Sequence, residues 1–105
     1  MSVIDDLFDI IEKRRGADKN ESYVAKMFAK GTKKIGQKVG EEAVETVIAG
    51  VAQSREDLID ESADLLFHLL ILWSDRGVTP KQVMKELEER MNKGRKDTTP
   101  GAAAL

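Results

Sequence analysis

The chain has 105 residues, of which 41% are hydrophobic and 34% are charged, with a formal net charge of −2. This size suits one folded domain, and the balanced charge argues against a duplex-DNA partner. The longest apolar stretch falls well short of the ~20 residues of a membrane span. The chain has no cysteine and starts with acids instead of a basic signal segment, so we expect a cytoplasmic protein without disulfides or cysteine-based zinc sites.

Helical signals begin at the N-terminus, and no alternating strand pattern interrupts them. Ser2 and Asp5 resemble a capping box in front of a first helix with apolar residues at helical spacing. The polar residues 15–21 predict a loop. Ser22 then begins a short second helix, which Gly31 ends.

Two long helices and a shorter one follow. Thr32 is the predicted cap of a helix over about residues 33–53, and the capping box at Ser54 begins a helix that ends near residue 76. Pro80 suits the first position of the last helix, which Gly94 is expected to end. We therefore expect an all-α domain over residues 1–94 and a flexible tail over residues 95–105.

One segment of the second long helix predicts a partner chain. Residues 65–73 are apolar on nearly every side, which predicts burial all round. One thin layer of short helices cannot easily cover such a helix. The expected fold is a helical bundle with two long central helices, completed by homodimerisation.

The charges are separated along the chain. Residues 22–40 contain five lysines and no acid, whereas residues 41–64 contain eight acids and one base. At about 100° per residue, the following charged residues share one arc of a helix that apolar residues flank on both sides: Lys34, Lys38, Glu41, Glu42 and Glu45. Apolar flanks indicate a charged cleft between packed elements.

A second acidic pair, Glu61 and Asp64, lies on one face of the next helix and is placed to face Glu42 and Glu45. Four carboxylates without a base among them repel one another, so they must bind protons or a cation. Carboxylate ligands suit a hard divalent ion, Mg²⁺ or Mn²⁺. With lysines nearby to bind phosphate, the pattern predicts cleavage of a phosphoanhydride.

Simpler interpretations compete with this one. Acids at this spacing are common on solvated helix faces, and Lys26 and Lys33 suit ordinary surface. His68 is better explained as a buried, hydrogen-bonded core histidine than as a metal ligand. Its position one turn after Asp64 also suits a role in orienting that side chain.

Two long stretches resemble the phosphoribosyl-ATP pyrophosphatase family, the second enzyme of histidine biosynthesis: SYVAKMFAKGTKKIGQKVGEEAVETVIA and DESADLLFHLLILWSDRGVTPKQVMKEL. The likeness extends from Ile4 to about Arg90. The spacing EExxE followed by ExxD also fits the wider MazG-type nucleoside triphosphate pyrophosphatases. In this chain it comprises Glu41, Glu42, Glu45, Glu61 and Asp64.

The resemblance implies that water cleaves the α–β phosphoanhydride of phosphoribosyl-ATP and releases phosphoribosyl-AMP and pyrophosphate. It implies a homodimer and a Mg²⁺ site, with Mn²⁺ as a substitute, built by Glu42, Glu45, Glu61 and Asp64. Lys34 and Lys38 are the expected phosphate-binding residues. Either Glu41 or Glu45 is the expected acceptor of the proton from water.

Two alternatives predict different behaviour. A related pyrophosphatase acting on nucleoside or deoxynucleoside triphosphates would share the acidic signature, although the DLLFHLL and FAKGT stretches favour the phosphoribosyl substrate. A non-catalytic helical dimerisation module would have exposed acids and bind no metal.

Overall fold

The computed structural model describes residues 2–96, so most of the predicted tail, residues 97–105, lies outside the described residues. These residues form an all-α fold, as predicted, and contain no strand. The elements, in chain order, are α1 (Val3–Lys13), α2 (Tyr23–Lys30), α3 (Thr32–Ala52), α4 (Arg55–Asp75) and α5 (Pro80–Lys96). None of these helices is both long and apolar enough to cross a membrane.

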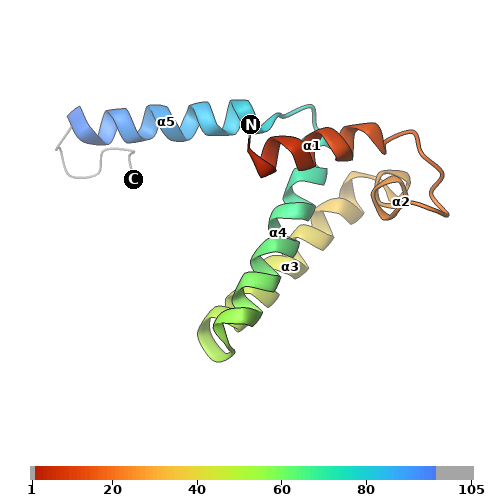
Figure 1. Ribbon diagram of the computed structural model, residues 1–105, viewed down its shortest axis with the longest axis horizontal. Helices are drawn as coiled ribbons and strands as arrows, with labels where there is room; N and C mark the ends of the chain where they lie inside the picture. Colours follow the sequence, from red (N-terminus) through yellow and green to blue (C-terminus); the bar gives the residue numbers. More distant parts are fainter. Residues whose placement is uncertain (1, 97–105) are drawn as a thin grey trace.

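Helices α3 and α4 form the long axis on which the site is built. They run antiparallel and side by side, and a two-residue connection joins them (Figure 1). The reciprocal capping box between Ser54 and Asp57 is present at the start of α4. The box satisfies backbone N–H groups that the first turn of a helix leaves free, which favours a sharp start to α4 after the turn.

Most predicted helix ends are confirmed, with two differences. Gly31 and not Thr32 is the N-cap of α3, and the Thr32 hydroxyl instead donates to Asp75 Oδ2 at 2.7 Å. Gly31 has φ +94°, which glycine adopts without strain, so the chain turns between α2 and α3 one residue earlier than expected. Helix α5 continues through Gly94 to Lys96, because a glycine weakens a helix without having to end it.

The core lies at one end of the hairpin, where α1 and α2 cover the α3–α4 pair (Figure 1). Its buried side chains come from four helices and are Phe8, Ile11, Val24, Met27, Ile35, Leu70 and Ile71. Arg15 closes this end by donating to the Ser74 carbonyl oxygen at 2.8 Å and by lying over the Phe28 ring. This packing holds α2 against the two long helices.

The other end of the hairpin leaves large apolar side chains exposed. In the single chain residues 65–73 are not buried all round, since Leu66 is 44% exposed. Their complete burial is expected only with a second copy of the chain, which stays a prediction. Burial there stops because α1 and α2 cover only one end of the α3–α4 pair. Further exposed apolar side chains on α3 and α4 are Val44, Val47, Ile48, Val51, Leu58 and Ile59.

Candidate metal centre and lysine cleft

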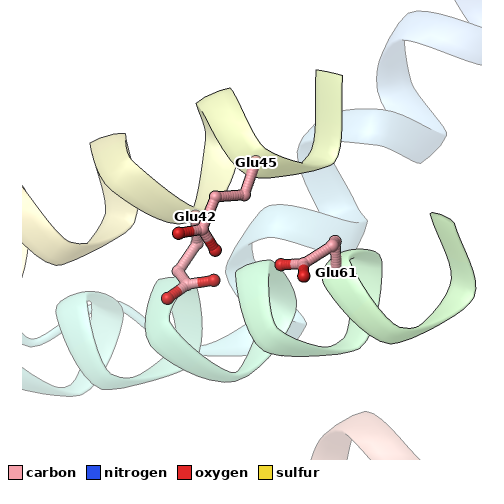
Figure 2. Close-up of side chains that lie close together, drawn as sticks. All are labelled: Glu42, Glu45 and Glu61. Atoms are coloured by element: carbon pink, nitrogen blue, oxygen red, sulfur yellow. The ribbon is translucent and has the colours of Figure 1, made fainter. Parts of the chain in front are cut away.

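Three carboxylates meet between the two long helices. Glu42 and Glu45 come from α3 and Glu61 comes from α4, and one carboxylate oxygen from each lies within 4.8 Å of the others (Figure 2). The spacing of Glu42 and Glu45 places them on one side of α3, and the antiparallel pairing brings Glu61 opposite. Glu42 is buried, Glu61 is half-buried and Glu45 is exposed.

A threonine holds the two helices together beside these acids. Thr46 shares its hydroxyl hydrogen between the backbone oxygens of Glu42, at 2.7 Å, and Glu61, at 3.1 Å. The backbone segments that carry two of the three carboxylates are therefore tied to each other. Such support limits how far the acids can move apart when they repel.

The acids carry buried oxygens without a partner. Oε2 of Glu42 and Oε2 of Glu61 are inaccessible to water and accept no hydrogen bond in the described residues. An unpaired buried charge is costly by several kcal/mol, and native proteins rarely retain one without a compensating partner. A hard divalent cation between these carboxylates would supply that partner, and the all-oxygen donor set suits one.

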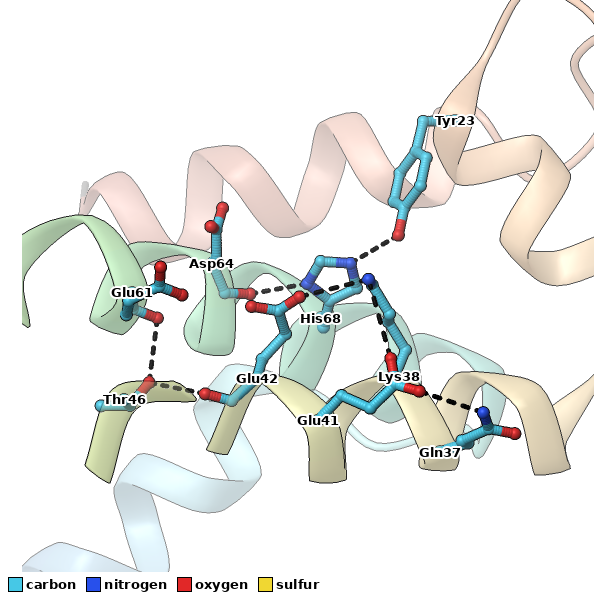
Figure 3. A network of polar contacts seen from close by, with 9 residues as sticks. All are labelled: Tyr23, Gln37, Lys38, Glu41, Glu42, Thr46, Glu61, Asp64 and His68. Carbon is cyan, nitrogen blue, oxygen red and sulfur yellow. Dashed lines mark hydrogen bonds and ion pairs between the residues drawn. The ribbon is translucent and has the colours of Figure 1, made fainter. Parts of the chain in front are cut away.

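The fourth predicted ligand lies differently. The carboxylate of Asp64 is exposed and stands outside the group of three, on the next turn of α4 (Figure 3). Its backbone oxygen instead contacts His68 Nδ1 at 2.7 Å. Of the four carboxylates that the sequence predicts to face one another, three therefore lie together and that of Asp64 does not.

A lysine also contacts Glu42, the buried acid of the carboxylate group. Lys38 Nζ lies 3.3 Å from Glu42 Oε1 and 3.8 Å from Glu41 Oε2 (Figure 3). The hydrogen bond to Glu42 raises the pKa of Lys38. Desolvation of the lysine acts in the opposite direction and lowers that pKa, but its effect is smaller. Glu41 also accepts from Gln37 Nε2 at 3.0 Å, so it lies at the edge of the carboxylates and not among them.

A cleft with a volume of about 270 Å³ opens beside Lys38, and basic side chains dominate its polar lining. Lys34 and Lys38, predicted from the sequence, both line it, and Lys34 Nζ donates to Gln37 Oε1 at 3.3 Å. Tyr23 and Lys30 from α2 also line it. Neither was predicted, because their place in the cleft depends on how α2 docks and no local pattern signals it.

Tyr23 and His68 connect this cleft to α4. The Tyr23 hydroxyl lies 2.6 Å from His68 Nε2, and partial burial raises the pKa of Tyr23 above its ordinary value of 10.0. His68 is only 6% exposed and both ring nitrogens have partners. The preferred interpretation of His68 as a buried, hydrogen-bonded histidine is confirmed.

A family model described as phosphoribosyl-ATP pyrophosphohydrolase matches residues 4–91. The chain is 50% identical over 88 residues to a phosphoribosyl-ATP pyrophosphatase of Paramagnetospirillum magneticum, covering 84% of this chain and 81% of that protein. A protein of the same name from Parvibaculum lavamentivorans is 48% identical over 102 residues, 97% of this chain and 92% of that protein. A histidine biosynthesis bifunctional protein of Photobacterium profundum is 45% identical over 87 residues, 83% of this chain and 42% of that protein. The chain belongs to the phosphoribosyl-ATP pyrophosphohydrolase family.

Proposed function

We propose that the protein hydrolyses the α–β phosphoanhydride of phosphoribosyl-ATP to phosphoribosyl-AMP and pyrophosphate, the second step of histidine biosynthesis. The observation that carries this proposal is the contact between Lys38 and Glu42, which joins a lysine-lined cleft to a group of carboxylates. A phosphate chain in the cleft would thus lie beside the acids. A cytoplasmic location stays a prediction from the sequence.

Within this proposal Mg²⁺, or Mn²⁺ in its place, would be held by Glu42, Glu45 and Glu61, and each of Glu42 and Glu61 has a buried oxygen without a partner. Asp64, the fourth ligand expected from the sequence, lies outside this group, and its carboxylate would have to move to join it. When bound, the ion supplies positive charge against the phosphates and makes water more acidic. The same charge offsets the repulsion among the acids.

The protein's own residues supply the rest of the mechanism. Lys34 and Lys38 hold phosphate oxygens and stabilise the charge that develops on departing pyrophosphate. Either Glu41 or Glu45 accepts the proton of the attacking water. Glu41 is held by Gln37 and Lys38 at the edge of the cleft, whereas Glu45 lies on the exposed side of the carboxylate group.

We also propose a homodimer in which a second copy covers the exposed apolar side chains of α3 and α4. Ile59 on α4 is 65% exposed, an unfavourable position for a large aliphatic side chain in a lone chain. Sedimentation of wild type and Ile59→Glu checks this: the variant should sediment as a monomer. Val3→Glu, an exposed change on α1, is the control and should stay dimeric.

An activity assay tests the function directly. Purified protein with Mg²⁺ should release pyrophosphate from phosphoribosyl-ATP, and Glu61→Gln should remove most of this activity. Glu88→Gln, which changes an exposed acid on α5, should retain it. Hydrolysis of a panel of nucleoside and deoxynucleoside triphosphates, without hydrolysis of phosphoribosyl-ATP, would instead identify the related class of pyrophosphatase.

A further inference from the structure

Tyr23 occupies the boundary between the lysine cleft and α4. It lines the cleft, and 46% of the residue is exposed. Its ring is stacked on Phe67, with centroids 6.0 Å apart, and meets the edge of His68. The hydroxyl is therefore held in one place at the cleft wall, facing His68 Nε2 (Figure 3).

The direction of the hydrogen bonds follows from the partner of the other ring nitrogen. The backbone oxygen of Asp64 can only accept, so Nδ1 of His68 carries the hydrogen. In the neutral ring, Nε2 then has a lone pair and the Tyr23 hydroxyl donates to it. The phenol hydrogen is thereby engaged, and the oxygen can only accept from a bound ligand.

An oxygen that can only accept does not suit a phosphate, whose oxygens are also acceptors. The lysines of the cleft already supply donors for phosphate oxygens. The neutral donors nearest to the phosphate chain of a nucleotide are the hydroxyl groups of its sugar. The phenol is protonated near neutral pH, because its ordinary pKa is 10.0 and partial burial raises it further.

We infer that Tyr23 is a substrate-binding residue that accepts a hydrogen bond from a sugar hydroxyl of the substrate, and that His68 is the positioning residue that orients it. This inference rests on the proposed function. It makes Tyr23 a specificity determinant that favours a sugar-bearing phosphate ligand over a bare polyphosphate. The lysines, by contrast, bind both kinds of ligand.

The test compares the two products as inhibitors of phosphoribosyl-ATP hydrolysis. Tyr23→Phe keeps the ring and removes the hydroxyl, and it should raise the inhibition constant of phosphoribosyl-AMP about three- to tenfold. The constant for pyrophosphate, which has no sugar, should change less than about twofold by the same reasoning. Thr32→Val, which loses an interhelical hydroxyl bond outside the cleft lining, should change neither constant.

His68→Asn tests the positioning role. Its amide can still donate to the Asp64 backbone oxygen but cannot reach Tyr23, so it should reproduce the selective effect of Tyr23→Phe. The double variant should be no worse than either single one, because both changes remove the same arrangement. Equal effects on the two products, additive effects, or no effect would overturn the inference, provided that the wild type is active. An inactive wild type would instead refute the proposed function.

Discussion

Lys38 Nζ lies 3.3 Å from Oε1 of Glu42, so a cation of the cleft is paired with the most buried acid of the carboxylate group. Only one oxygen of Glu42 has this partner, and the other has none. Glu42 thus lies between the positive charge of Lys38 and the carboxylates of Glu45 and Glu61. This ion pair therefore connects the lysine cleft directly to the carboxylate group.

The ion pair predicts a dependence of stability on alkaline pH. Contact with Glu42 raises the pKa of Lys38 above its ordinary value of 10.5. A raised pKa in the folded state gives stabilisation that is fully present below the unfolded value and is lost as pH rises through the folded value. Urea unfolding at increasing pH above about 10.5 should therefore show a steeper loss of stability for wild type than for Lys38→Met.

The matched control for that experiment is Lys81→Met, an exposed lysine on α5. It should follow the wild-type dependence on pH. Parallel curves for wild type and Lys38→Met would show that the ion pair with Glu42 does not contribute in solution.

Tyr23 predicts a direct spectroscopic measurement, since it is the single tyrosine of the chain. Burial is the main cause that raises its pKa in the folded state, although Lys38 opposes it. The ultraviolet absorbance change on tyrosine ionisation should therefore have its midpoint above 10.0 in folded protein and near that value in denaturant. A folded midpoint at or below the denatured one would contradict the environment described for Tyr23.

The unpartnered oxygens predict opposite effects of one substitution with and without metal. Glu61→Gln removes one of the repelling charges, so it should raise the melting temperature of metal-free protein. Mn²⁺ at about 100 times its dissociation constant should stabilise wild type by about 2.7 kcal/mol. The variant should lose most of that gain, as differential scanning calorimetry would measure.

Glu88→Gln again supplies the control, because Glu88 is an exposed acid on α5, a different helix from Glu61. It should leave both melting temperatures close to wild type. If Mn²⁺ stabilises wild type and Glu61→Gln equally, the carboxylate group is not the metal site.

The hydroxyl of Thr46 predicts a link between helix packing and metal affinity. Thr46→Val keeps the shape but removes the bonds to the backbone oxygens of Glu42 and Glu61. It should lower the free energy of unfolding by about 1 kcal/mol and weaken Mn²⁺ binding. Thr46→Ser retains the hydroxyl and should lose much less of the Mn²⁺ affinity in isothermal titration. Similar affinities for all three proteins would refute a supporting role for Thr46.

Local patterns in the sequence predicted most of the helix boundaries, because a helix cap depends on residues that are close together in the chain. The caps at Ser22 and Ser54 form within one turn, and they locate the starts of α2 and α4. The spacing of Glu42 and Glu45 also determines their common face of α3. The start of α3 was missed by one residue, since Gly31 adopts a positive φ that a propensity argument does not foresee.

The sequence by itself determined the helices, the separation of lysines from acids, and the family resemblance, all of which are properties of composition and short-range spacing. Only the tertiary structure decided that Glu61 joins Glu42 and Glu45 while the side chain of Asp64 lies outside. It also brought Tyr23 of α2 against His68 of α4. These contacts depend on helix docking and on side-chain rotamers, and the free energies that select them come from packing between residues far apart in the chain.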